Sequence, residues 1–323
     1  MADNNIIRRE FLKRTLKAGI AIGAVSGGAF LLHDRKEIIS AEEAAASVRD
    51  FRIQGTGMPS MTIANGEQPA NIVRAAVEGM GGMKRFISKG DVVVIKPNIA
   101  WDRVPEQAAN TNPEIVAETV RLCYDAGAKK VIVTDVSCND PRRCFFRSGI
   151  GKASKDTGAD VRIPEDYKFR NVAIKGEVID VWPVYTAILE ADKVINIPIV
   201  KHHSLSTLTL GMKNWYGLLG GQRRELHQNI HKSIADLASF IRPTLTIIDA
   251  YRILIRNGPQ GGSLNDVKMM NTVAVSIDPV AADAFASTLF DIKPEDIPYI
   301  VEAHKRGLGN INYMELQPIV ISA

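Results

Sequence analysis

Residues 193–221, KVINIPIVKHHSLSTLTLGMKNWYGLLGG, decide which kind of fold this chain can adopt. The apolar run VINIPIV is flanked by charged residues, which predicts a buried strand. Cationic, imidazole, amide and glycine residues follow this run: Lys201, His202, His203, Gly211, Lys213 and Asn214. Polar groups directly after a buried strand are typical of an open α/β sheet, which binds its ligands outside the carboxyl ends of its strands. The stretch therefore predicts an α/β fold with a site at this strand end.

Segments on both sides of this stretch predict the remaining elements of a sheet covered by helices. Short apolar runs predict strands at 91–96, 130–135, 244–250, 271–279 and 317–322. Apolar residues at helical spacing predict helices at 69–82, 113–127, 145–158, 183–191, 231–241, 279–290 and 294–306. Weak alternation predicts a hairpin or an edge pair at 171–181. We therefore expect a single α/β domain over residues 47–323, with a mainly parallel sheet and helices on both faces.

The overall charge gives no indication of a nucleic-acid partner. The 323 residues are 46% hydrophobic and 24% charged, which is ordinary for a globular protein. The net charge is +4, but residues 8–17 alone hold five basic residues against one glutamate. The remainder is nearly neutral, and such a balance does not predict nucleic-acid binding.

The basic N-terminal segment has the features of an export signal. Residues 7–13, IRREFLK, resemble the twin-arginine signal in their paired arginines, the aromatic–leucine step and the trailing lysine. The uncharged segment 18–32 is too short and too glycine-rich for a spanning helix, but it fits a signal h-region. Residues 44–46 offer a cleavage site, so residues 1–46 are either a removed signal or a retained membrane anchor with its linker. The resemblance implies the twin-arginine export machinery as a partner, a periplasmic or other extracytoplasmic location, and folding before export.

Five of the predicted strands end in polar residues, and parallel strands would bring those ends to one edge of the sheet. The residues are Lys96 and Asn98, Asp135, Lys201 to His203, Asp249 and Asp278. An aspartate after a strand often caps the next helix, and capping is the simpler explanation for any one of the three aspartates. The set of five strand ends is what indicates a site.

Several motifs, taken together, resemble the domain of unknown function 362 family. They are VVIKPN (93–98), TNPEIVAETV (111–120), VIVTD (131–135), IPIVKHH (197–203), LGMKNWYGLL (210–219), LTIIDA (245–250), NGPQGG (257–262) and SIDPVAADA (276–284). In this order they cover roughly residues 60–320. The resemblance supports the fold and the site, and it implies no established reaction. Many members carry a cysteine-rich ferredoxin-like segment, which this chain lacks, and three cysteines do not suit an iron–sulfur cluster.

The predicted site residues suit an anionic small molecule or cofactor. Lysine is a point-charge partner for phosphate or carboxylate, and glycine allows close backbone approach to a ligand. The predicted cofactor-binding residues are Lys96, Asn98, Gly211, Lys213, Asn214 and Asp278. The predicted catalytic residues are Lys201, His202, His203, Asp135 and Asp249. Adjacent histidines in an extended chain point to opposite sides, so we expect one of them to reach the pocket as a general acid–base, with Asp135 or Asp249 orienting it.

Histidine and cysteine pairs raise two further possibilities. His227 and His231 have i, i+4 spacing, which places both on one helix face and suits a metal, whereas two polar-face histidines at a helix start are the alternative. Cys138 and Cys144 lie in a turn-rich segment and could form a disulfide in an oxidising compartment.

These features predict an exported enzyme or cofactor-dependent redox protein that binds an anionic small molecule, with the reaction and the cofactor left open. The alternative is a non-catalytic solute- or cofactor-binding protein that serves a membrane partner. A third possibility is a metal-dependent hydrolase, which requires His202 or His203 to lie beside His231 and an aspartate.

Overall fold

The computed structural model describes residues 49–53 and 57–323. The predicted export signal, its h-region and its cleavage site lie outside the described residues. These described residues group as one compact unit. Within the described part of that unit, no helix combines the length and the apolar character needed to cross a membrane.

A mainly parallel sheet forms the centre of this unit, in the order β12-β1-β11-β10-β7-β2-β3-β4. The strands on this path are β1 (Met61–Asn65), β2 (Val92–Pro97), β3 (Lys130–Thr134), β4 (Asp160–Arg162), β7 (Lys193–Ile197), β10 (Leu245–Leu254), β11 (Val267–Ser276) and β12 (Ile319–Ser322). Neighbours from β10 to β4 pair in parallel, as do β12 and β1. Strand β11 alone on this path is antiparallel to both of its neighbours. The predicted mainly parallel sheet is therefore confirmed, with one reversed strand on this path.

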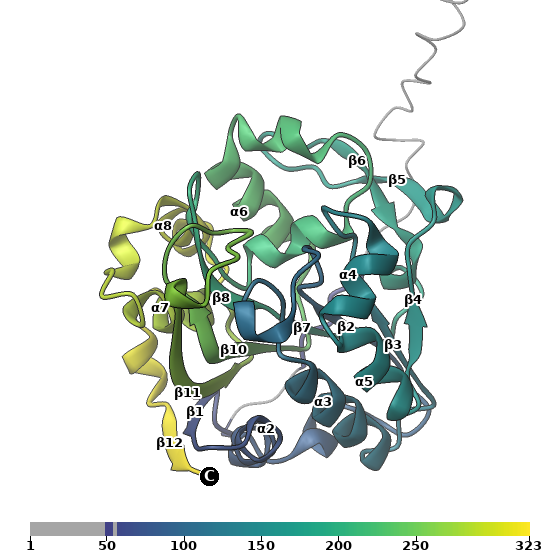
Figure 1. Ribbon diagram of the computed structural model, residues 1–323. Helices are drawn as coiled ribbons and strands as arrows, with labels where there is room; N and C mark the ends of the chain where they lie inside the picture. The colour runs from purple at the N-terminus through teal and green to yellow at the C-terminus, as the bar shows by residue number, and fades with distance from the viewer. Residues whose placement is uncertain (1–48, 54–56) are drawn as a thin grey trace, which may run out of the picture. The chain divides into compact units, whose positions relative to one another are not determined.

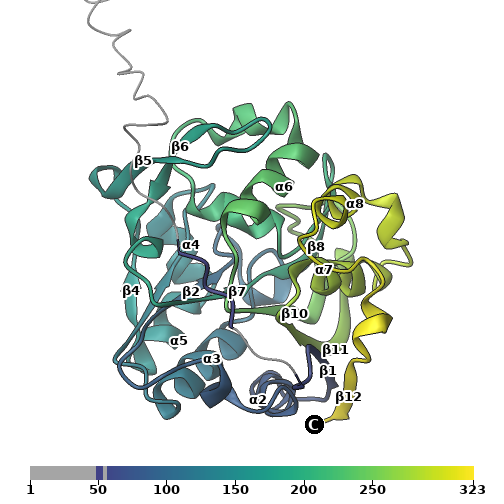
Figure 2. The same ribbon diagram turned by 180° about the vertical axis from the view of Figure 1, so that it is seen from behind.

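Helices cover both faces of the sheet (Figures 1 and 2). One face carries α2 (Pro69–Gly79), α3 (Pro113–Asp125), α4 (Pro141–Arg147) and α5 (Ile150–Asp156), and the other carries α6 (Ile230–Phe240), α7 (Pro279–Thr288) and α8 (Pro298–Lys305). In β2, Val93 and Ile95 pack into the core under α2 to α5, and Val94 packs into the core under α6 to α8. Since successive strand side chains point to opposite faces, the run VVVI fills both cores, and each such buried side chain contributes about 1.5–3 kcal/mol. The three-layer α/β architecture is confirmed.

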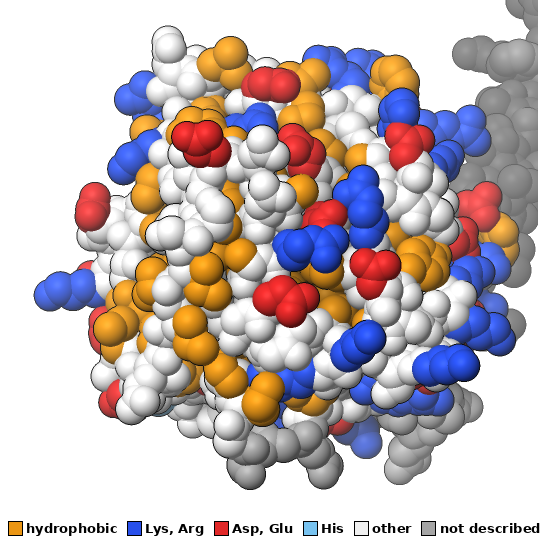
Figure 3. Space-filling model, turned by 90° about the horizontal axis from the view of Figure 1, so that it is seen from below, with side chains coloured by type: hydrophobic (Ala, Val, Ile, Leu, Met, Phe, Trp, Pro, Cys, Tyr) orange, Lys and Arg blue, Asp and Glu red, His pale blue; other side chains and the backbone are white. Residues whose placement is uncertain are grey.

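The outer surface seen from below carries basic and acidic side chains interspersed with one another (Figure 3). Mixed charges of this kind partly cancel one another's fields.

Two predicted helices differ from the structure. The segment 145–158 forms α4 and α5 with a break at Gly149, whose φ of 72° lies in the left-handed region. The prediction of a helix at 183–191 was wrong, because the chain continues as β6 (Val181–Tyr185) and then makes a single 3₁₀ turn at Thr186–Ile188. Strand β6 pairs with β5 (Phe169–Ala173) as a separate antiparallel hairpin, which agrees with the predicted pairing in this region. This hairpin lies near α6 in both ribbon views, and Asp236 of α6 accepts hydrogen bonds from the turn between its strands.

Residues 193–221 form three strands rather than the single strand expected. After β7, Pro198 interrupts the strand and the chain continues as β8 (Ile199–His203). Proline cannot donate to a ladder, so it favours a break in a central strand. Strand β8 pairs with β10 and forms a hairpin with β9 (Thr207–Thr209). Lys201, His202 and His203 therefore lie within a strand that extends beyond the carboxyl edge of the sheet, and not in a loop.

Candidate functional site

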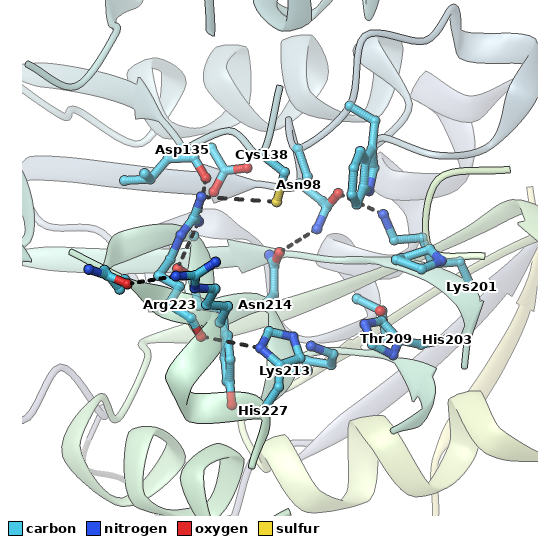
Figure 4. A pocket seen from close by; sticks show the side chains of 18 residues that line it. Asn98, Asp135, Cys138, Lys201, His203, Thr209, Lys213, Asn214, Arg223 and His227 are labelled. Carbon is cyan, nitrogen blue, oxygen red and sulfur yellow. Dashed lines mark hydrogen bonds between the residues drawn. The ribbon is translucent and has the colours of Figure 1, made fainter. Parts of the chain in front are cut away.

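A pocket of about 550 Å³ opens at the carboxyl edge of the sheet (Figure 4). Strands β8 and β9, the segments after β2 and β3, and the 3₁₀ helices η5 (Lys213–Leu218) and η6 (Arg223–His227) contribute its walls. Several predicted site residues line it: Asn98, Asp135, Lys201, His203, Lys213, Asn214 and His227. The parallel strands thus bring together residues that are more than 100 positions apart in the chain.

A buried ion pair forms the floor behind this pocket. The Nζ atom of Lys96 lies 2.6 Å from Oδ1 of Asp135, and the two side chains are 0% and 1% exposed. Asp135 also accepts a hydrogen bond from the backbone N–H of Ile99 at 2.6 Å. Burial lowers the pKa of Lys96, and the carboxylate of Asp135 opposes that effect. The pair neutralises Asp135, which is the only carboxylate among the described residues that line the pocket.

Amide side chains connect this ion pair to Lys201. Asn214 accepts from Nζ of Lys96 at 2.9 Å and from Nδ2 of Asn98 at 3.0 Å, and it donates to Asn196 at 2.9 Å. Oδ1 of Asn98 in turn accepts from Nζ of Lys201 at 3.0 Å. Because these acceptors and donors are buried and each has a partner, the network fixes the positions of both lysines.

Gly217 of η5 must be a glycine for this arrangement to form. A Cβ atom there would lie 1.9 Å from Oδ1 of Asp135 and 2.6 Å from Nζ of Lys96. Its carbonyl also accepts a hydrogen bond from Val136 at 2.8 Å. The absence of a side chain lets η5 approach the ion pair closely.

Lys201 is 1% exposed and has no carboxylate partner among the described residues. Its Nζ donates to Oδ1 of Asn98 and, at 2.6 Å, to the carbonyl oxygen of Ala109. Burial is the largest cause of a lowered pKa, and the charges of Lys213 and Lys96 add to it, so that the pKa of Lys201 falls to about 7. A large fraction of this amine is therefore neutral at neutral pH.

Lys213 is 6% exposed, and its Nζ has no hydrogen-bond acceptor or carboxylate partner in the part of the chain that the structure describes. The ammonium lies 4.4 Å from the centre of the Tyr216 ring. Burial and the charge of Arg223 lower the pKa of Lys213 to about 8. Asp283 holds the preceding turn by accepting from the N–H groups of Gly211 and Met212. The site thus contains a rigidly placed cation with unused donors.

The two adjacent histidines point apart, and only His203 lines the pocket. Its Nδ1 accepts from the backbone N–H groups of Leu205 and Ser206, at 3.1 and 3.3 Å, so that Nε2 carries the proton. Burial and the nearby lysine charges lower the pKa of His203 to about 2. His203 is therefore a neutral donor held by backbone groups, and the expected orienting aspartate is absent from the described surroundings. His202 instead accepts from Gly258 at 3.2 Å.

Asp278 and Asp249 do not line the pocket, which corrects the expected convergence of all five strand ends. Asp278 follows the reversed strand β11, so it lies at the opposite edge of the sheet, where it caps α7 by accepting from Val280 and Ala281. Asp249 is fully buried and accepts from the N–H of Asn112 at the start of α3. Burial raises the pKa of Asp249 to about 6. Gly211 and Lys96 also lie outside the pocket wall, behind the residues that line it.

The expected pairing of His227 and His231 on one helix was wrong. His227 ends η6, where its ring stacks against that of His203 at 6.2 Å between centres. His231 lies in α6 and stacks against Tyr299 instead. Among the described residues, no group of three or more His, Cys, Asp or Glu side chains is placed to hold a metal. The geometry required for the metal-dependent hydrolase is therefore absent from this part of the chain.

Further pocket residues were not predicted as site residues. Arg223 and Arg224, which follow the predicted stretch after one intervening glutamine, line it together with Trp101 and Tyr216. Arg223 donates to the carbonyl oxygens of Val136 and Ser137, each at 2.7 Å, and its Nη2 lies 4.0 Å from Sγ of Cys138. The pair of adjacent arginines just beyond residue 221 is the sequence signal for this part of the wall.

Cys138 and Cys144 are both free thiols in the structure. Cys138 is exposed at the pocket, whereas Cys144 is buried in α4 and lies 3.6 Å from the carbonyl oxygen of Ala100. The disulfide that the spacing allowed is thus not formed here.

The fold and the pocket define an α/β protein with a pocket lined by several basic side chains at the carboxyl edge of a mainly parallel sheet. Residues 93–288 match the family described as domain of unknown function (DUF362), and the chain belongs to this family. It is 27% identical over 245 residues to the thylakoid-associated protein sll1697 of Synechocystis, a match that covers 73% of this chain and 74% of that protein.

Two solved structures show a limited likeness. The lactate racemase apoprotein from Thermoanaerobacterium thermosaccharolyticum has 14% sequence identity and a TM-score of 0.44, with 75% of this chain and 58% of that chain covered. A protein from Thermotoga maritima has 11% identity and a TM-score of 0.41, with 69% and 58% covered. The match spans less than two thirds of either solved chain, and it assigns no ligand or activity to this protein.

Proposed function

We propose that the pocket binds an anionic small molecule or cofactor. The observation that carries this proposal is the excess of basic side chains that line the pocket. Lys201, Lys213, Arg223 and Arg224 line the pocket, while Asp135, the one carboxylate among the described lining residues, is already paired with Lys96. A buried ammonium such as Lys213, with no acceptor among the described residues, is stabilised when an anion supplies one.

Of the functions predicted from the sequence, the enzyme or cofactor-dependent redox protein has more support than a non-catalytic binding protein. Lys201 and Lys213 lie in one pocket with pKa values of about 7 and about 8. Strongly perturbed titratable groups that converge in a pocket are typical of catalytic sites. A passive anion site needs only charged lysines, so lysines that titrate near neutral pH favour proton transfer or nucleophilic chemistry.

The affinity for a simple dianion is expected to fall as the pH rises. Oxalate keeps its charge between pH 6 and pH 9, whereas Lys201 and Lys213 lose protons through about 7 and about 8. If both cations contact the ligand, titration calorimetry should give a dissociation constant that is roughly 100-fold or more higher at pH 9 than at pH 6. The Lys201→Met variant should lack the part of this change near pH 7. Equal affinity at both pH values, or no oxalate binding at pH 6, would contradict the proposed anion site.

We also propose export by the twin-arginine route, with either release into an extracytoplasmic compartment or retention by an uncleaved leader. The support is the segment IRREFLK at 7–13. The name of the Synechocystis relative refers to thylakoid association, which agrees with a protein that works beside a membrane. Replacing Arg8 and Arg9 together by lysine should keep the protein in the cytoplasmic fraction while an unchanged chain is exported. The matched control is Lys13→Arg, and export of the double variant at the normal level would overturn this route.

A further inference from the structure

We propose that the ligand of this pocket is an anionic carbonyl compound, such as a 2-oxo acid, and that its carbonyl carbon forms an imine with Nζ of Lys201. This inference rests on the proposed anion site and adds a covalent step to it. It follows from three features of the wall: the acceptors around Lys201, the separate cation Lys213, and the neutral donor His203.

The surroundings of Lys201 suit a neutral amine. Its Nζ has two partners, Oδ1 of Asn98 at 3.0 Å and the carbonyl oxygen of Ala109 at 2.6 Å. A neutral amine has two N–H bonds and one lone pair, so both hydrogens are used by these oxygens and the lone pair points away from them. No carboxylate among the described residues pairs with Nζ to favour the ammonium form. Lys201 lines the pocket, so a bound carbonyl carbon can approach this lone pair.

The second lysine provides the fixed charge that an anionic carbonyl compound needs. The ammonium of Lys213 faces the ring of Tyr216 at 4.4 Å, a contact that stabilises the charged form. Together with Arg223 it can hold the carboxylate of a 2-oxo acid, which leaves the adjacent carbonyl for Lys201. The charge of Lys213 also disfavours a proton on Lys201, and the pKa of Lys201, about 7, agrees with this division of roles.

His203 supplies a neutral hydrogen-bond donor on the same pocket wall. Its Nδ1 is occupied by the backbone N–H groups of Leu205 and Ser206, so the proton is on Nε2. An N–H donor on the same wall as Lys201 can polarise the carbonyl oxygen. Because His203 has a pKa of about 2, it remains neutral and does not add charge beside the two lysines.

The step is balanced without any oxidant or reductant. The amine lone pair of Lys201 attacks the carbonyl carbon, a proton passes from nitrogen to the oxygen, and a carbinolamine forms. Loss of one water then breaks the remaining C–O bond and forms C=N. The products are the imine and water, and hydrolysis reverses the step.

Reductive trapping tests this inference with glyoxylate, an anionic aldehyde, and cyanoborohydride at pH 7. Digestion and mass spectrometry should find N-carboxymethyl-lysine at Lys201, formed at least about 10-fold faster than at the exposed Lys152 and Lys155, because the pocket holds the anionic aldehyde beside Lys201. Oxalate should protect Lys201, because it occupies the same cations and has no aldehyde. Trapping at Lys201 should increase as the pH rises from 6 to 7.

The outcomes separate the two proposals. Oxalate binding without preferential trapping at Lys201 overturns the imine and leaves the anion site standing. Absence of both overturns the anion site as well. Trapping at Lys201 that oxalate does not reduce also overturns the inference, because the reaction would then not depend on the anion site. The key measurement uses the unaltered full chain, so it does not depend on whether a Lys201 variant folds.

Discussion

Replacing Asp135 with asparagine is expected to lower the free energy of unfolding by about 3 kcal/mol, the largest effect on stability that the site predicts. Lys96 is 0% exposed and lies 2.6 Å from Asp135, so the substitution leaves its ammonium buried without a counter-charge. Urea unfolding at pH 7 should show the change as a lower midpoint with a similar slope.

Two controls identify the cause. The double variant Lys96→Met, Asp135→Asn removes the buried charge altogether and should recover most of the lost stability. Asp156→Asn breaks the exposed pair with Lys152, whose side chains are 56% and 82% exposed, and should change stability by less than about 0.5 kcal/mol. An unchanged midpoint for Asp135→Asn would mean that the ion pair does not hold the pocket floor together.

Replacing Lys213 with methionine is expected to act in opposite directions on stability and on binding. Oxalate affinity at pH 6 should fall roughly 30-fold or more, because the ligand loses a desolvated cation. The free energy of unfolding at pH 7 should rise by about 2 kcal/mol, because a buried ammonium without an acceptor among the described residues is replaced by an apolar chain of similar length. A purely structural residue would lose stability on substitution.

The stability gain expected for Lys213→Met depends on pH. The pKa of Lys213 in the folded protein, about 8, is below its ordinary value of 10.5, so the folded state binds this proton less tightly than the unfolded state. The resulting loss of folding stability is complete below pH 8 and decreases as the pH rises toward 10.5. The stability gain of Lys213→Met should therefore be largest near pH 7 and shrink above pH 8, whereas Lys155→Met at an exposed position should give no such trend. A stability loss at every pH would contradict the role of Lys213 as an unpaired cation.

The sequence predicted the sheet and much of the site because local patterns carry that information. Runs such as VVVI at 92–95 are apolar at every position, which indicates strands buried on both faces, and the polar ends of parallel strands lie at one edge. This reasoning brought Asn98, Lys201, Lys213 and Asn214 to one pocket. It also separated His202 from His203, since adjacent residues in a strand point apart.

The errors come from the direction of one strand and from a break between two helices. Asp278 has the same local pattern as Asp135, a buried strand followed by an aspartate, yet β11 is antiparallel and carries it to the opposite edge. The spacing of His227 and His231 is helical, but the chain changes from η6 to α6 between them. Neither strand direction nor a break between helices is specified by apolar spacing alone.

The sequence by itself determined the α/β class, the helices on both faces and a cationic site beside the stretch 193–221, because apolar periodicity and the residue types that follow each strand are local properties. Only the tertiary structure decided what each charge does. Lys96, Lys201 and Lys213 are the same residue type, but their surroundings differ. Lys96 is paired with Asp135, Lys201 donates to two neutral oxygens, and Lys213 faces the Tyr216 ring. Those differences arise from partners as many as 103 residues away, and burial turns them into different protonation behaviour.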